Sequence, residues 1–427
     1  MYGMVADTGA DIFQGQGMGP LAKWVDNHIF FRVPRAHLSA YNTQHTKWHC
    51  EIKVHRGCRQ DGSCLWYGGK DLLNNSTEEF DEDCTMQLWD LANVSPRSTA
   101  DWEFTYANIN IDSLSDHLGI KWETSKSIPF GEEVTYLGFQ WNLRSRVIYL
   151  PNKKKARYLA VIAEWREKHT HDLCKTQRLY RKLLHAMLVI PAGRAYLTSL
   201  EAMLASFNDS PFRPHTPPRS TPDNLNWWQH QLRWAIILIP VCRPQPLTDY
   251  KAYSDASSSF SMAITIGPRW QAWQLVAGWK SQGRDIQWAE AVRFELLTLC
   301  VCSFSSKGEH IVLYGNNQGV VKGWWKCCST NKLTNHVFQH VLQLSEDRHR
   351  KIHTRYVLSA KNPTDGPSQG HYSPPAPSCS TPLPSPTRYN HFSLMSNLGE
   401  LAKKVTIRHL VRTQELDNLG AKQQTVK

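Results

Sequence analysis

The order of strand-like and helix-like segments between residues 249 and 357 constrains the fold of this 427-residue chain more than any other feature. Three runs rich in β-branched and aromatic residues come first, and apolar residues at helical spacing follow over Ile286–Phe304. One strand, two shorter helices and a last strand are expected after it. The strands are expected at Asp249–Ser254, Phe260–Ile266, Trp270–Leu275, Ile311–Tyr314 and Lys351–Val357, and the shorter helices at Gly319–Lys326 and Lys332–Ser345. This order predicts a mixed α/β domain over residues 249–370.

Proline and serine mark the boundaries of this domain. Ser210–Pro222 contains five prolines, which interrupt helices and central strands, so it predicts a linker or connection over 210–248. His371–Thr387 is richer still in proline and serine and predicts a disordered tail over 371–427. Before the linker, residues 1–141 and 142–209 are expected to form two further regions.

Residues 142–209 are expected to be basic and helical, after a strand hairpin made by Val134–Trp141 and Arg146–Leu150. Helices are expected from Lys153, over Thr176–Ile190 and over Gly193–Phe207. The formal net charge of the chain is +12, and residues 144–182 alone hold 12 basic and 3 acidic side chains. Basic helices beside a hairpin suit a polyanionic partner such as nucleic acid, although a solvated helical bundle explains the same pattern.

Composition excludes several classes of protein. The longest apolar run, about Trp234–Cys242, is far shorter than the ~20 residues that a membrane span needs. The N-terminus has no basic start followed by an apolar stretch, so no secretory signal is expected. Eleven cysteines at irregular spacings favour a reducing compartment over a disulfide framework. We therefore expect an intracellular protein, in the cytoplasm or the nucleus.

Three acids interrupt the apolar patterns of the α/β domain. Asp255 ends the first strand, Glu295 lies within the long helix, and Asp365 follows the last strand. An acid among apolar neighbours is costly unless it binds a cation or a hydrogen-bond donor. If the three converge, they predict a divalent metal site, and two such ions can drive phosphodiester hydrolysis. Scattered surface acids are the alternative.

Four motifs in this order resemble the ribonuclease H domain of retroelement polyproteins, especially the DIRS-like elements of fungi. The motifs are YSDASSS, FELLTL, LYGNNQGV and NPTDGPSQG. The resemblance implies an RNase H-like hydrolase that cleaves RNA in RNA–DNA hybrids with Mg²⁺ or Mn²⁺. It places the catalytic positions at Asp255, Glu295, Asn316 and Asp365, with Asp255, Glu295 and Asp365 as metal ligands. The family has aspartate where this chain has Asn316, so weakened metal binding and cleavage are expected.

Upstream motifs resemble the palm and thumb of a reverse transcriptase. Tyr136–Phe139 resembles the primer-grip hairpin, and Leu183–Leu197 resembles a segment of the thumb. Trp24–Asn27 resembles the paired-aspartate turn, but Asp26 is followed by Asn27 where the family has a second aspartate. The resemblance spans about residues 1–370 and is weak over 40–120. It implies a partial palm over 1–141, a thumb over 142–209, no polymerase activity, and other polymerase-derived chains as further partners.

Two groups of basic residues are expected to bind nucleic acid. Lys153, Lys154, Lys155 and Arg157 open the first basic helix. Lys322 and Lys326 flank a pair of tryptophans that could contact a hybrid duplex. Trp227 and Trp228, in contrast, are expected to pack rather than stack on bases. The rival hypothesis is a pseudoenzyme, a catalytically dead nucleic-acid-binding relic of a transposable element.

Overall fold

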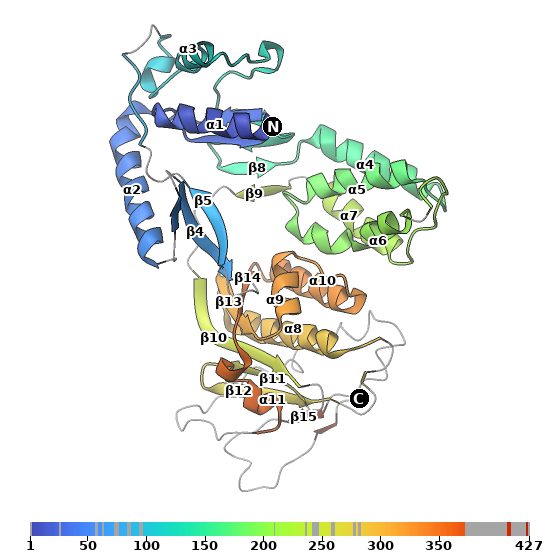
Figure 1. Cartoon of the computed structure of the whole chain (residues 1–427). Helices are drawn as coiled ribbons and strands as arrows, with labels where there is room; N and C mark the ends of the chain where they lie inside the picture. The colour runs from blue at the N-terminus through green and yellow to red at the C-terminus, as the bar shows by residue number, and fades with distance from the viewer. Residues whose placement is uncertain are drawn as a thin grey trace. The chain divides into compact units, whose positions relative to one another are not determined.

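The structure is a computed structural model that describes most of the chain up to residue 371 (Figure 1). The described residues are 2–24, 27–55, 59–61, 64–71, 77–82, 87–93, 97–208, 210–234, 237–240, 247–257, 261–275, 279–280, 283–371, 408–410 and 424–425. They divide into two compact units. The first unit comprises Met1–Leu137 and Trp141–Arg144, and the second comprises Gly138–Gln140 and Ser145–Lys427.

The first unit packs a helix and a short hairpin around an aromatic core. Phe13 and Tyr106 are fully buried in this core, and the Tyr106 hydroxyl donates to the Phe31 carbonyl at 2.7 Å. The hairpin pairs β1 and β2 in antiparallel register. The elements of this unit are α1 (Tyr2–Gly15), β1 (Leu21–Trp24), β2 (Asn27–Phe30), η1 (Arg35–His37), α2 (Leu38–His55), β3 (Arg59–Asp61), β4 (Cys64–Asp71), β5 (Thr77–Glu82), η2 (Asp101–Glu103), α3 (Asn108–Leu118), η3 (Thr124–Lys126) and β6 (Glu133–Tyr136).

The strand expected over residues 134–141 is divided in two by a turn. β6 ends at Tyr136 and β7 (Phe139–Asn142) begins after Leu137 and Gly138, whose φ angles are 50° and 78°. Glycine adopts this left-handed backbone without strain, and two such residues in succession are typical of a tight hairpin turn. A Cβ at Gly138 would also lie 1.6 Å from Lys154 Nζ. The backbone therefore favours glycine here, whereas the close contact involves only the flexible end of the Lys154 side chain.

The basic region of the second unit folds as a helical bundle that extends beyond its expected end. It contains α4, α5, α6 and the 3-10 segment η4, and a further helix, α7, which lies inside the segment predicted to be a linker. Pro222 stands in the first turn of α7, where proline is well tolerated, and Trp228 of the same helix is fully buried. β8 pairs with β9, also within that segment. The segment predicted as a linker or connection thus contains a helix over 221–233 and a strand over 238–240. The bounds are β8 (Val147–Tyr149), α4 (Asn152–Arg166), α5 (Leu173–Ala186), η4 (Pro191–Tyr196), α6 (Thr198–Ser206), α7 (Thr221–Arg233) and β9 (Leu238–Pro240).

The expected mixed α/β domain is confirmed, and the described strands form a sheet that begins in the order β14-β13-β10-β11-β12. β10, β11 and β12 are antiparallel neighbours, whereas β13 and β14 run parallel to β10. The bounds are β10 (Leu247–Ala256), β11 (Ser261–Ile266), β12 (Arg269–Gln274), α8 (Ile286–Phe304), β13 (His310–Gly315), α9 (Gln318–Trp325), α10 (Lys332–Asp347), β14 (Lys351–Tyr356), η5 (Ser359–Lys361) and α11 (Asp365–Ser368). Each strand and helix expected here overlaps one of these elements.

α8 is the central helix of this domain. Its N-cap Asp285 accepts a hydrogen bond from the Trp288 amide at 2.9 Å, which fixes where the helix begins. Most of its residues are buried, because it packs against β10 and β11 on one side and α10 on the other. Side chains on different faces of α8 therefore have different neighbours, and the roles of its two buried acids, Glu290 and Glu295, differ accordingly.

Little of the predicted tail is described. β15 (Arg408–Leu410) pairs with β12 and with β16 (Gln424–Thr425), and the rest of 372–427 lies outside the described residues. Among the helices that the structure describes, none is long and apolar enough to cross a membrane.

Candidate functional site

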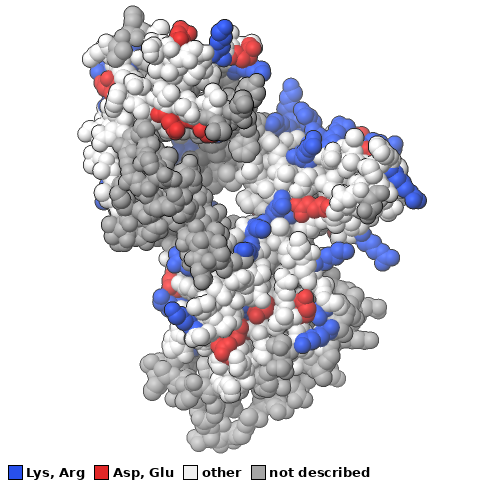
Figure 2. Space-filling view, in the orientation of Figure 1, with Lys and Arg blue, Asp and Glu red and all other residues white. Residues whose placement is uncertain are grey.

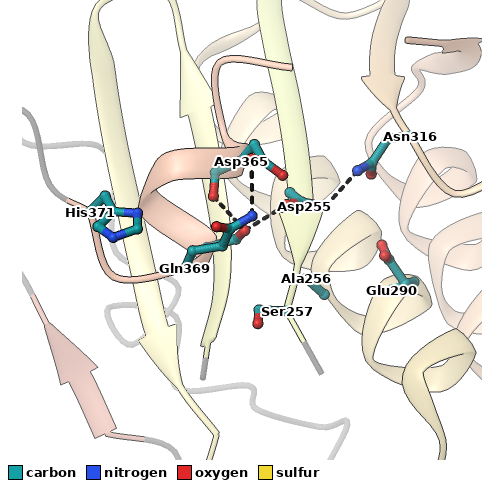
Figure 3. A pocket seen from close by; sticks show the side chains of 9 residues that line it. Asp255, Ala256, Ser257, Glu290, Asn316, Asp365, Gln369 and His371 are labelled. Carbon is teal, nitrogen blue, oxygen red and sulfur yellow. Dashed lines mark hydrogen bonds between the residues drawn. The ribbon is translucent and has the colours of Figure 1, made fainter. Parts of the chain in front are cut away.

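A polar pocket of about 440 Å³ lies at the carboxyl ends of β10 and β13 in the α/β domain (Figure 3). β10 and β13 are parallel neighbours, so their carboxyl ends bring Asp255 and Asn316 side by side. α8 contributes Glu290, and α11 contributes Asp365. The pocket is lined by Asp255, Ala256, Ser257, Glu290, Asn316, Asp365, Ser368, Gln369 and His371. The structure thus brings together three of the four predicted catalytic positions.

Hydrogen bonds within the protein engage the carboxylates of Asp255 and Asp365 (Figure 3). Asp255 Oδ1 accepts from Asn316 Nδ2 at 2.8 Å, and Oδ2 accepts from Ser368 Oγ at 2.6 Å. Asp365 Oδ2 accepts from Gln369 Nε2 at 3.0 Å. Both oxygens of Asp255 therefore already have donors from the chain itself.

Glu290, the acid that α8 supplies to the pocket, is paired with an arginine one turn later. Glu290 is 5% exposed and Arg293 is 1% exposed, and Arg293 Nε donates to Glu290 Oε2. Burial raises the pKa of Glu290, and the positive charge of Arg293 partly opposes that rise. The sequence signal for Glu290 was the acid in WAEAV, which lies closer to the start of the helix than FELLTL.

Glu295 does not join the pocket, and its predicted place among the catalytic and metal-binding acids is wrong. Five residues along a helix turn a side chain by about 140° away from Glu290. Glu295 instead faces α10, where its Oε1 lies 4.0 Å from His340 Nδ1. Within the described part of the chain, Glu295 Oε2 has no hydrogen-bond partner, and burial raises its pKa well above the usual value.

Replacing Glu295 with leucine is expected to stabilise the protein by about 1–3 kcal/mol at pH 8, because it removes a buried acid with an unsatisfied oxygen. The folded pKa of Glu295 exceeds its unfolded value. Ionisation of Glu295 therefore lowers the stability of the wild-type protein. This loss is absent below pH ~4.5 and grows as pH rises. The gain over wild type should grow from pH 5 to pH 8 in urea unfolding. Glu167→Leu, at an exposed helix end, is the control and should change stability by less than about 0.5 kcal/mol. An equal gain at both pH values would contradict this assignment.

The segment predicted to resemble a polymerase turn, Trp24–Asn27, lies in the first unit. Asp26 lies outside the described residues. Asn27 is exposed at the start of β2, and its carbonyl accepts from the Tyr136 hydroxyl at 3.1 Å. This contact joins two segments that both resemble polymerase motifs.

Of the basic residues predicted to bind nucleic acid on α4, three remain available and one does not. Lys153 and Arg157 are exposed, and Lys154 is partly buried against Gly138. Lys155 is 7% exposed and its Nζ donates to the Trp234 carbonyl at 3.1 Å, so it serves the fold rather than the surface. The prediction for Lys155 is therefore wrong.

Lysine and arginine gather on α4 and α5 (Figure 2). The pKa of Lys182 is lowered by burial first and then by the positive charges of Arg157, Arg178 and Lys154. A pKa shift with these causes indicates that the four side chains lie near one another. Arg178 is already paired with Glu164 at 3.4 Å, and the remaining cations of the cluster are candidates for contact with an anionic ligand.

Of the two tryptophans beside Lys322 and Lys326 on α9, Trp324 belongs to the core, whereas Trp325 is half-buried and its indole nitrogen is engaged by the fold. Trp324 Nε1 donates to the Ile352 carbonyl at 2.8 Å, and Trp325 Nε1 donates to the Thr354 carbonyl at 3.1 Å. Lys326 is exposed at the end of the helix, whereas Lys322 is half-buried.

The chain matches no protein-family model and no curated protein. Among solved structures, that of the foamy viral protease–reverse transcriptase in complex with an RNA/DNA hybrid is weakly similar to it, with a TM-score of 0.20 and 11% sequence identity. The similarity covers 82% of this chain and 62% of that chain, so this chain spans less than two thirds of its length.

Proposed function

We propose that this chain is a fragment of a retroelement-type reverse transcriptase and RNase H polyprotein, and that it binds RNA–DNA hybrids without cleaving them. One observation carries this proposal. Acids from the first strand, the long helix and the segment after the last strand line one pocket; the RNase H resemblance implies the first and the third of them, whereas it places the helix acid at Glu295. These acids are Asp255, Glu290 and Asp365.

The side chains of the pocket do not fit the two divalent ions that the resemblance implies. Across the residues that the structure describes, no group of three or more acids, histidines or cysteines could hold a metal ion. Both oxygens of Asp255 accept internal hydrogen bonds, and Glu290 is neutralised by Arg293. Asn316 also lacks the charge that the family's aspartate would supply. We therefore favour binding of a hybrid over hydrolysis of its RNA strand with Mg²⁺ or Mn²⁺.

The basic surface of the second unit supports a polyanionic ligand. Lys153, Arg157 and Lys182 lie on α4 and α5, where burial first and then neighbouring positive charges lower the pKa of Lys182. Each lysine or arginine that contacts a phosphate releases counterions, so the affinity should fall steeply with salt.

The proposal is tested by titrating the full chain against a labelled RNA–DNA hybrid between about 50 and 200 mM salt, in EDTA and in Mg²⁺ or Mn²⁺. We expect salt-sensitive binding that does not require the metal, and an intact RNA strand. The absence of binding at the lowest salt concentration would overturn the proposal. Cleavage by the wild-type chain in Mg²⁺ or Mn²⁺ would instead favour an impaired RNase H-type hydrolase, for which the three acids that line the pocket are the supporting observation.

Replacing Lys153 and Arg157 with alanine is expected to weaken hybrid binding at low salt and to reduce the salt slope by about 1 for each phosphate that these side chains neutralise. Both side chains are exposed on one helix, so the fold should be unaffected. The matched control replaces Lys121 and Lys126, exposed lysines of the first unit, with alanine. An equally large weakening in the control would mean that binding follows net charge alone rather than the α4 surface.

A further inference from the structure

A buried arginine, Arg293, contacts two of the side chains that line the pocket. Arg293 donates from Nε to Glu290, from Nη1 to Ser254 Oγ at 2.5 Å, and from Nη2 to Asn316 Oδ1 at 3.3 Å. It is held against the backbone at Gly315, where a Cβ would lie 3.3 Å from Nη2. Arg293 is 1% exposed, and a buried positive charge is stable only when acceptor groups of the protein pair and hydrogen-bond with it. Two of these partners, Glu290 and Asn316, line the pocket, and the third, Ser254, directly precedes Asp255 on β10.

Asn316 completes this arrangement because its amide can accept and donate at once. Its Oδ1 faces the guanidinium of Arg293, and its Nδ2 donates to Asp255 Oδ1 and to Ser359 Oγ, the latter at 3.1 Å. An aspartate here would present an oxygen to Asp255 at the same 2.8 Å separation, where two carboxylates repel each other. An amide suits a position between a fixed cation and a carboxylate, whereas a carboxylate does not.

We propose that Arg293 is the built-in cation of this pocket. It is a positioning residue whose guanidinium holds Glu290 directly and Asp255 through Asn316, in the place of a divalent ion. The pocket therefore keeps its acids together without metal. This inference deepens the proposed function by explaining why hybrid binding should not depend on metal, but it is tested on the free protein.

One consequence is that restoring aspartate at position 316 is not sufficient to restore a metal site. In Asn316→Asp, the new carboxylate would pair with Arg293, which already contacts that position, and the cation would still neutralise Glu290. Only removal of Arg293 together with Asn316→Asp leaves four carboxylates with no internal cation. Those four, at positions 255, 290, 316 and 365, are hard oxygen ligands of the kind that Mg²⁺ and Mn²⁺ prefer.

The test is Mn²⁺ titration by calorimetry, together with thermal unfolding of the full chain in EDTA and in Mn²⁺, with no nucleic acid present. Wild type and Asn316→Asp are each expected to bind no Mn²⁺ at the pocket, so the Tm of each protein should be the same in EDTA and in Mn²⁺. Arg293→Ala/Asn316→Asp is expected to bind Mn²⁺ and to gain about 5 °C in Tm when the metal is saturating. Arg350→Ala/Asn316→Asp is the matched control. Arg350, like Arg293, donates to a serine hydroxyl of this domain (Ser305), but it is not among the residues that line the pocket. This control variant should behave as Asn316→Asp alone.

Arg293→Gln/Asn316→Asp provides a second double variant that removes the charge but keeps a hydrogen-bonding side chain. A double variant that folds only when Mn²⁺ is present would support the proposal directly. Saturable Mn²⁺ binding by wild type or Asn316→Asp, with an affinity within about tenfold of the double variants, would overturn it. The proposal would also be overturned if neither double variant bound Mn²⁺, whether or not it folded, because a metal ion would then not replace the removed arginine. A failure of hybrid binding would overturn the proposed function and leave this result unaffected.

Discussion

Replacing Arg293 with methionine is expected to lower the free energy of unfolding by about 3–5 kcal/mol at pH 8, the range found when one partner of a buried ion pair is removed. Glu290 would be left buried at 5% exposure without its cation, and Ser254 and Asn316 would each lose a donor. Urea unfolding of the full chain, followed by tryptophan fluorescence, measures this loss. It is the largest effect that we expect from a single substitution near the pocket.

The dependence of this loss on pH separates charge from packing. Burial already raises the pKa of Glu290, and removal of Arg293 raises it further, since the arginine opposes that shift. A folded pKa above the unfolded one means that stability is lost as pH rises. The gap between Arg293→Met and wild type should therefore be larger at pH 8 than at pH 5.

A double-mutant cycle completes this test. Glu290→Gln/Arg293→Met removes both charges and should recover a large part of the loss, because a neutral pair has no uncompensated charge to bury. A loss below about 1 kcal/mol for Arg293→Met, or one that is the same at both pH values, would contradict the view that Arg293 neutralises Glu290.

The fold of the α/β domain could be predicted closely because each element has a strong pattern of its own. Apolar residues at helical spacing define α8 with the bounds Ile286–Phe304 that the structure shows, and the β-rich runs overlap β10 to β14. The bundle was less predictable, because five prolines suggested an irregular chain. One of them, Pro222, instead stands at the start of α7, where proline is compatible with a helix.

The candidate site was only partly predictable, because motif letters do not fix which face of a helix a residue occupies. Glu295 matches the FELLTL motif but faces α10, whereas Glu290, five residues earlier, faces the pocket. No sequence pattern indicates the role of Arg293, since that role depends on residues from β10 and β13 that become neighbours only in the folded sheet.

The same reasoning applies to the basic helix α4. Lys155 precedes Tyr158, Ile162 and Trp165 at helical spacing, so it lies on the buried stripe of the helix. For Lys155, the helical spacing to these apolar residues predicts burial better than its place in the basic run predicts a surface role. Its neighbour Lys153 lies off the stripe and is exposed. A run of like charges on a helix therefore identifies a binding surface only for the members that share the exposed face.

Replacing Trp228 with alanine is expected to destabilise the helical bundle by about 3–5 kcal/mol, the usual cost of removing a large buried aromatic side chain. Trp228 is 0% exposed, and its ring lies against Gly193 of η4, where a Cβ would be 2.3 Å from the ring. Beside it, Trp227 stacks on Tyr196 with ring centroids 3.9 Å apart. Thermal and urea unfolding of the full chain measure the loss.

Two further variants decide whether α7 is a structural helix of the bundle or part of a linker. Trp234→Ala, at a tryptophan just after α7 that is 58% exposed, is the control and should change stability by less than about 0.5 kcal/mol. Gly193→Ala keeps Trp228 but places a methyl group into its ring, so it should also be destabilising. If residues 221–233 formed only a linker, all three variants would unfold as wild type does. A large loss for Trp228→Ala and Gly193→Ala, with none for Trp234→Ala, would establish that the chain passes through the bundle core before it enters the α/β domain.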